Sequence, residues 1–115
     1  MKSWLTLATL IGLMAPTIAH AQTDDILATA PLLVGCRAFV ENDPNGNSMQ
    51  MGACAGAVST ALQIARAQGK ACPPPGSLII HAARVVVEFS DERAERRSQP
   101  FGPMAVSALS DRWHC

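Results

Sequence analysis

The chain has 115 residues, with 9 Lys+Arg, 9 Asp+Glu and a formal net charge of +0 at pH 7. This length suits a single domain with one modest core. The charge balance leaves no basic excess of the kind that binds nucleic acid, and no polybasic cluster of the kind that binds a membrane surface. Both classes of partner are therefore set aside.

Residues 1–21 are predicted to be a signal peptide. Lys2 provides a positive charge, the apolar run Trp4–Met14 follows, and Ala19-His20-Ala21 places small residues two apart before a cleavage site. This is the secretory pattern, and the run is too short to span a bilayer. The alternative is an N-terminal membrane anchor. We expect a single exported domain, residues 22–115, located in the periplasm and free of the membrane after cleavage.

Four cysteines follow the predicted cleavage site. They are Cys36, Cys54, Cys72 and Cys115. An even number of cysteines in a short exported chain predicts two disulfides, for which sequence alone allows three pairings. The alternative is a four-thiolate metal site, but such sites usually contain closely spaced cysteine pairs, which this chain lacks. We expect neither a metal site nor a cofactor.

Two helices are predicted in the first half of the domain. Pro31 suits the first turn of a helix that continues to about Glu41, and a dense turn signal at 43–47 follows. Ser48 is the expected N-cap of a second helix, which Gly69 should end. The inner face of that helix is marked by apolar residues spaced three and four apart. They are Cys54, Ala57, Val58, Ala61, Leu62 and Ala65.

A proline-rich connector at 72–76 precedes a third predicted helix. Ser77 is its expected N-cap, and Val85-Val86-Val87 is the part that could instead form a strand. The length of the periodic segment and the lack of a partner strand favour the helix. Its apolar face is predicted from a stripe of four residues. They are Leu78, Ala82, Val85 and Phe89, with Ile79, Ala83 and Val86 beside them.

Gly102-Pro103 is predicted to open a fourth helix, with Ala105, Leu109 and Trp113 facing inward. The predicted fold is therefore all-α, a compact four-helix domain stapled by disulfides. If the first two helices form a hairpin, Cys36 and Cys54 face each other. If the fourth helix returns antiparallel to the start of the third, its final residue meets the connector. The favoured pairs are Cys36–Cys54 and Cys72–Cys115.

The sequence offers no catalytic constellation. It contains no GxSxG, HExxH, P-loop or dinucleotide motif, and no CxxC redox pair. His81 lies among aliphatic residues, where a core or boundary position is more common than a ligand. Met49, Met51 and Met104 lack the close repeated spacing of a copper site, so we predict that they fill the core. We expect a protein that is not an enzyme.

Residues 90–99 carry six charged side chains and no large apolar one. One interpretation is a solvated helix end and loop, and the other is a loop that faces a protein partner. The charged residues are Asp91, Glu92, Arg93, Glu95, Arg96 and Arg97.

The cysteine frame resembles a known family. A Cys closes the first helix, Cys54-Ala55-Gly56 opens the second, Cys72-Pro73 forms a connector, and Trp113-His114-Cys115 ends the domain. A valine-rich helix that finishes at Phe89 lies between the last two features. The pattern covers about residues 32–115 and is similar to the Rap/Tai family, the immunity proteins against type VI secretion amidase effectors. Ala57 stands where the family usually has an aromatic residue, and Thr60 stands where it has a glycine.

The resemblance implies a compact helical fold similar to the chaperone HdeA. It also implies a periplasmic protein, often a homodimer, that inhibits an incoming peptidoglycan amidase by plugging its cleft. We hypothesise that the plug is the loop 91–99. The expected partner-binding residues are Asp91, Arg93, Glu95, Arg96 and Arg97. The alternatives are an envelope chaperone that exposes apolar faces on acidification and a standalone envelope protein with another role.

Overall fold

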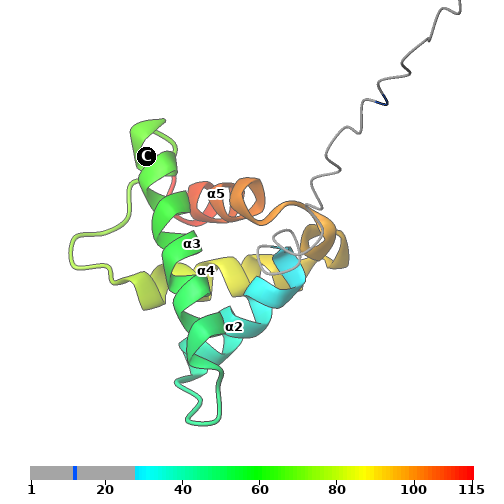
Figure 1. Ribbon diagram of the computed structural model, residues 1–115. Coiled ribbons are helices and arrows are strands. Elements are labelled where there is room, and N and C mark those ends of the chain that lie inside the picture. Colours follow the sequence, from blue (N-terminus) through cyan, green and yellow to red (C-terminus); the bar gives the residue numbers. More distant parts are fainter. Residues whose placement is uncertain (1–11, 13–27) are drawn as a thin grey trace, which may run out of the picture.

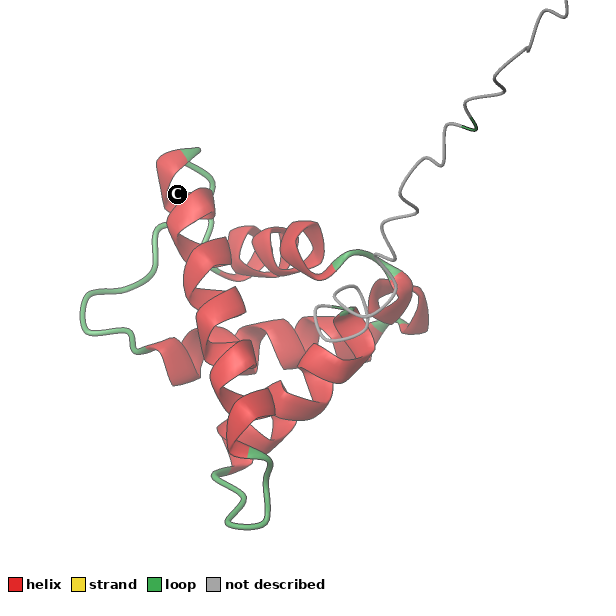
Figure 2. Ribbon diagram, viewed as in Figure 1, coloured by secondary structure: helices red, strands yellow, loops and turns green. Residues whose placement is uncertain are grey.

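The computed structural model describes Gly12 and residues 28–115. These residues form four α-helices, α2 (Thr29–Glu41), α3 (Ser48–Ala67), α4 (Ile79–Glu92) and α5 (Phe101–Arg112), and the 3-10 helix η1 (Ala94–Ser98). The part of the chain that the structure describes contains no strand, which confirms the all-α class (Figure 2). The predicted signal peptide, 1–21, lies outside the described residues apart from Gly12. None of the described helices combines the length and apolarity that crossing a membrane requires.

Helix α3 is the longest element, and the other helices are arranged around it. It pairs with α2 and also packs against α4 and α5. In Figure 1, α3 runs across the front of the molecule, with α2 beside its first half and α5 beside its second half. Helix α4 lies behind α3 and packs against both α2 and α5. Four helices thus enclose one core, as predicted.

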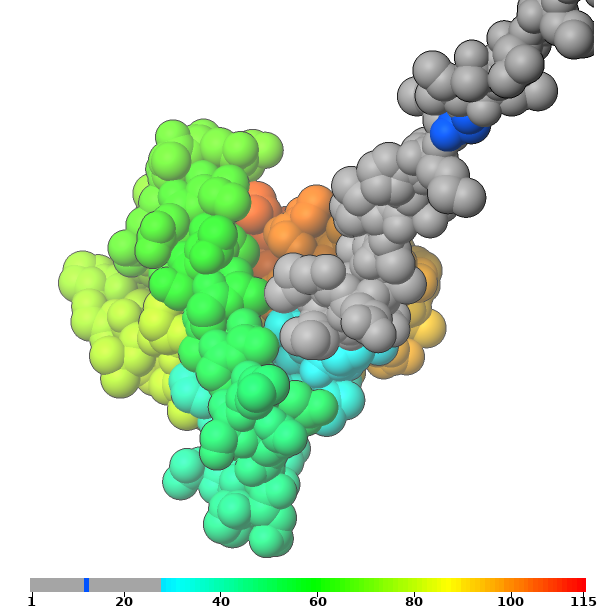
Figure 3. All heavy atoms as spheres, viewed as in Figure 1, coloured from blue at the N-terminus to red at the C-terminus, as the bar shows by residue number. Residues whose placement is uncertain are grey.

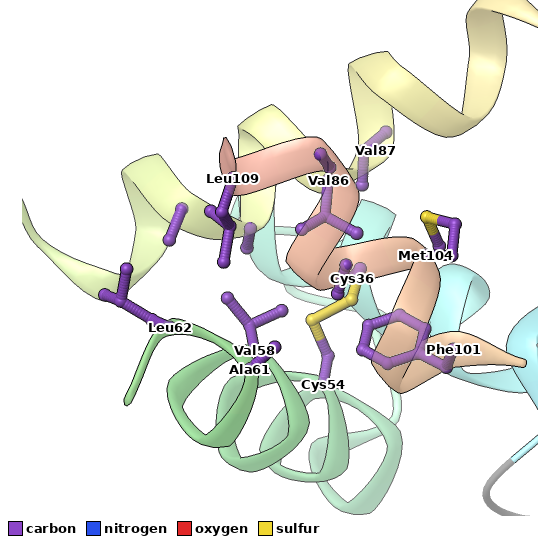
Figure 4. Close-up of a cluster of buried hydrophobic side chains, with 14 of the residues drawn as sticks. Cys36, Cys54, Val58, Ala61, Leu62, Val86, Val87, Phe101, Met104 and Leu109 are labelled. Atoms are coloured by element: carbon purple, nitrogen blue, oxygen red, sulfur yellow. A yellow bond between two sulfur atoms is a disulfide. The ribbon is translucent and has the colours of Figure 1, made fainter. Parts of the chain in front are cut away.

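The Cys36–Cys54 disulfide lies inside that core. Both cysteines are fully buried, and the bond joins α2 to α3 with a Cα–Cα distance of 5.1 Å. Side chains from all four helices surround it, including Val58, Val86 and Leu109 (Figure 4). The predicted pairing is confirmed, and the disulfide fills core volume in addition to closing a loop.

The junction between α2 and α3 depends on backbone contacts. Gly35 lies so close to α3 that a Cβ atom there would sit 2.1 Å from the carbonyl oxygen of Gln50. Helix α2 ends with Asn42 in the left-handed conformation (φ 51°), which asparagine tolerates better than most residues. Asn47, not the predicted Ser48, caps α3, because its side chain accepts hydrogen bonds from the amides of Met49 and Gln50. The cap is thus one residue earlier than expected.

Helix α3 ends just before Gly69, as predicted, and its end forms a Schellman motif. Gly69 has φ 67°, and its amide donates to the carbonyl of Arg66 over 3.0 Å. The Lys70 amide donates to the carbonyl of Ala65 over 2.8 Å. This pair of bonds satisfies carbonyl groups that the end of a helix would otherwise leave without partners.

Helix α4 begins one residue later than predicted, and its buried face only partly matches the predicted one. Its N-cap is Leu78, whose amide donates to Nδ1 of His81 over 3.0 Å, so the predicted Ser77 cap and the predicted core or boundary position of His81 are both wrong. His81 is exposed, and its ring accepts a hydrogen bond from a backbone amide at the start of the helix. The strand alternative at 85–87 is also wrong, since these residues are helical. The buried face is rotated from the predicted stripe. It consists of Ala82, Ala83, Val86, Val87 and Ser90.

Helix α5 starts at Phe101, two residues before the predicted proline start. Phe101 is buried in the core. The first helical residue thus packs into the core, and the helix starts earlier than the proline indicated. Met104 is buried as expected, but Met49 is 77% exposed, so the prediction that it fills the core is wrong. At the far end of α5, the predicted Cys72–Cys115 disulfide is confirmed with a Cα–Cα distance of 4.9 Å.

Candidate protein-binding site

The charged segment 91–99, which begins in the last turn of α4, is attached to α2 at its beginning. The Arg37 guanidinium donates to both carboxylate oxygens of Asp91, with a distance of 2.8 Å from Nη1 to Oδ2. Arg97 reaches the same carboxylate, with its Nη1 atom 3.5 Å from Oδ1. Two-point contact between a guanidinium and a carboxylate fixes direction as well as distance. Asp91 therefore joins the end of α4, the turn η1 and helix α2.

The same segment is attached to α2 a second time at its end. The hydroxyl of Thr29, a buried residue in the first turn of α2, donates to the carbonyl oxygen of Gln99. Thr29 and Arg37 both belong to α2, so this helix holds the two ends of the charged segment. In Figure 3, η1 lies at the edge of the molecule, next to the first part of α2. The segment is thus a protruding turn on a fixed base.

Arg96 holds the middle of the segment. Its Nη1 atom donates to the carbonyl of Phe89 over 2.7 Å and lies 3.0 Å from Oε2 of Glu92. The guanidinium carbon lies 3.6 Å above the centre of the Phe89 ring, a favourable cation–π distance. Only 18% of this side chain is exposed. Arg96 is therefore directed into the molecule, toward α4.

Arg93 and Glu95 are directed outward. Both are exposed, and neither forms an ion pair or a side-chain hydrogen bond with another described residue. The structure brings the five predicted partner-binding residues together within one short segment. It gives them different surroundings, because Asp91, Arg96 and Arg97 form ion pairs while Arg93 and Glu95 form none with the described residues.

The contacts of Asp91 alter its acidity. The hydrogen bonds from Arg37 lower the pKa of Asp91, the charges of Arg37 and Arg97 add to this effect, and partial burial opposes it. The reciprocal hydrogen bond raises the pKa of Arg37. At neutral pH the pair is therefore fully charged. Asp91 is 42% exposed, so solvent and salt weaken the contact.

A largely apolar groove of about 960 Å³ adjoins the turn. It lies between α2, α3 and the start of α5, and Arg97, Ser98 and Gln99 form its edge on the η1 side. Ala57 and Thr60, the two positions where the chain departs from the family pattern, both line it.

Sequence reasoning missed Arg37 and Thr29, the two residues of α2 that hold the turn. Arg37 carried a detectable signal, because it is the lone charged residue between Pro31 and Val40. A single charge within an apolar helix calls for a partner. Nothing in the sequence indicated that this partner would be Asp91, which lies 54 positions away.

The geometry defines a class of protein: a small helical scaffold, cross-linked by two disulfides, that carries a protruding charged turn. Among the described residues no three His, Cys, Asp or Glu side chains come together as a metal site would require. The chain belongs to the Rap1a immunity proteins, because the model of this family matches residues 24–115. No curated protein matches the chain, and no solved structure does.

Family membership confirms the predicted resemblance and identifies the general role. The family consists of immunity proteins, which protect by binding a cognate secreted effector and are generally not enzymes. Such a role requires a surface that another protein can recognise. The turn from Asp91 to Gln99 is the candidate for that surface.

Proposed function

We propose that this chain is a periplasmic immunity protein that binds and inhibits a peptidoglycan amidase effector. The observation that carries the proposal is the segment 91–99, which contains η1, protrudes from the scaffold, is attached to α2 at both ends and exposes Arg93 and Glu95. A ready-shaped turn can enter a cleft with little loss of conformational freedom, which favours affinity. The membership of the immunity family supports a cognate secreted effector as the partner.

Two further features support the periplasmic location. The chain holds two disulfides, which persist in oxidising compartments and are rare in the cytosol. The predicted signal peptide would deliver the chain to such a compartment. Fractionation of cells should place the protein in the periplasm, with its N-terminus at Gln22. A cytosolic protein with free thiols would contradict the location.

The inhibition assay uses the purified protein, residues 22–115, and a secreted peptidoglycan amidase, which is sought first among the products of the neighbouring genes. We expect an equimolar amount of the protein to stop cleavage of isolated peptidoglycan, measured by chromatography of the released muropeptides. Replacing Arg93 and Glu95 with alanine should weaken inhibition, because both side chains are exposed on the turn. An amidase that stays fully active with excess protein would refute the proposal.

The same preparation tests the predicted homodimer. Light scattering coupled to size exclusion measures the mass of the free protein and of its complex. A mass of two chains supports the dimer and predicts a complex with two amidase molecules. A mass of one chain refutes the dimer. The proposed inhibition would still hold, since one chain presents one complete turn to the amidase.

A further inference from the structure

Helix α4 ends without the backbone contacts that close α3. After Glu92 the chain becomes extended at Arg93, with φ −143° and ψ 125°. Within the described part of the chain, no backbone amide beyond the helix donates to the last carbonyls of α4. Carbonyls at a helix end need partners, which side chains, water or ligands provide when the backbone does not.

Arg96 supplies one of these partners from the turn itself. Its Nη1 atom donates to the carbonyl of Phe89, in the last turn of α4, and its guanidinium lies over the ring of the same residue. The ion pair with Glu92 adds a second contact to that helix turn. A cationic group at the C-terminal end of a helix also interacts favourably with the helix dipole. One side chain thus ties η1 to the helix before it.

We infer that Arg96 is a positioning residue, which fixes the turn η1 against α4 so that Arg93 and Glu95 are presented to the partner. This inference rests on the proposed function of the turn. The Arg96 side chain is mostly covered by Phe89 and Glu92, so it is occupied before a partner arrives. Arg96 therefore affects binding indirectly. It sets the fraction of free molecules in which the turn already has the conformation that binds the partner.

A residue that sets this fraction has a recognisable kinetic effect. When only part of the population is competent, the apparent affinity falls by that fraction, and the loss appears in the association rate. A residue that contacts the partner directly acts mainly on the dissociation rate. Arg96 and Arg93 should therefore differ in which rate constant changes.

The first experiment measures amide hydrogen exchange in the free protein. In the Arg96→Ala variant, we expect the amides of residues 93–98 to exchange about tenfold faster, because a charge-assisted hydrogen bond has been removed. The amides at the start of α3 should keep their rates. Arg96→Lys should lie between the two, since lysine keeps the charge but loses the planar group that covers Phe89. Unchanged exchange at 93–98 in Arg96→Ala would overturn the inference.

The second experiment measures binding to the amidase used in the inhibition assay. Arg96→Ala should lower the association rate as the competent fraction falls, by a factor no larger than the roughly tenfold change in exchange, with little change in dissociation. Arg93→Ala is the matched control, and it should raise the dissociation rate without changing the exchange. Faster dissociation as the main effect of Arg96→Ala would make Arg96 a contact residue and overturn the inference.

The two proposals can fail separately. If neither Arg93→Ala nor Glu95→Ala changes binding, the turn is not the partner surface and the proposed site is wrong. The exchange experiment still decides whether Arg96 orders the turn. If both variants weaken binding while Arg96→Ala changes neither exchange nor association, the site stands and the positioning role is refuted.

Discussion

Different kinds of contact hold the connection between α2 and α3 and the connection between α4 and α5. The first has a left-handed Asn42, the Asn47 cap, the close approach of Gly35 to Gln50 and a buried disulfide. These contacts involve backbone, close packing and a covalent bond. They are insensitive to salt and to pH near neutrality.

The connection after α4 depends on charged side chains at a solvent-exposed surface. Arg37, Asp91 and Arg97 form one cluster, and Arg96 with Glu92 forms another. Such contacts are individually weak and are screened by salt. The scaffold and the candidate binding turn therefore differ in how easily they are loosened. This difference means that salt or a single side-chain change can loosen the turn while the scaffold stays folded.

Removing the buried disulfide should have the largest effect. Replacing Cys36 and Cys54 with alanine should lower the free energy of unfolding by about 5 kcal/mol, about 3 from loop closure and about 2 from lost packing. Urea unfolding measures the change. Replacing Cys72 and Cys115, which are exposed, should cost about 4 kcal/mol, from loop closure alone. A larger loss at the exposed pair would contradict the role of the core disulfide in packing.

The next effect concerns the close contact between α2 and α3. Gly35→Ala should destabilise the protein by about 3 kcal/mol, because its Cβ atom would overlap the Gln50 carbonyl and force the helices apart. Gly52→Ala is the matched control, since a Cβ atom there meets nothing within 4 Å. That change should stabilise the helix by up to about 1 kcal/mol. Similar melting temperatures for the two variants would show that the helices separate easily.

A smaller effect is expected at the charged connection. Arg37→Ala should cost about 1 kcal/mol and speed amide exchange at 93–98, while the α2–α3 junction stays protected. Salt at about 1 M should have a similar effect on the wild-type turn, since it screens exposed pairs. Arg84→Ala is the control, because Arg84 is exposed on α4 and forms no ion pair with a described residue. Equal amide exchange at both junctions in Arg37→Ala would show that the charged connection is no easier to loosen than the α2–α3 junction.

The smallest effect is a pH dependence of less than about 1 kcal/mol. The pKa of Asp91 is lowered in the folded state, so its contribution is complete above the ordinary value of 3.8. That contribution is lost as the pH falls through the lower, folded value. The Asp91→Asn variant should lose this part of the acid dependence, and a carboxyl NMR titration of Asp91 would report the shift directly. A pKa at or above the ordinary value would mean that Arg37 does not hold Asp91 in solution.

The four helices and both disulfides followed from local patterns, namely apolar spacing, turn residues and the order of the cysteines. The cap of α3 was displaced because Asn47 and Ser48 are adjacent and both are good caps. The buried face of α4 was misjudged because residues 78–83 are all apolar except His81. Apolar residues on every side leave the rotation of the helix about its axis poorly defined.

The candidate site was predicted only in part for a different reason. The segment itself stood out because its charges are contiguous. What holds it did not, because Arg37 and Thr29 lie 54 and 70 positions from their partners. Contacts at this separation depend on how helices pack, and local patterns do not encode that. The division between inward Arg96 and outward Arg93 likewise required the direction of each side chain.

The placement of the two disulfides has a consequence for oxidative folding. Cys36 and Cys54 are separated by 18 positions and Cys72 and Cys115 by 43, so the first pair meets sooner in an unfolded chain. In the finished protein the order of access is reversed, because Cys36 and Cys54 are buried while Cys72 and Cys115 are exposed. A reductant therefore opens the later bond first and leaves a partly reduced protein whose core bond is intact. Reoxidation from that species needs one correct bond and offers no wrong partner.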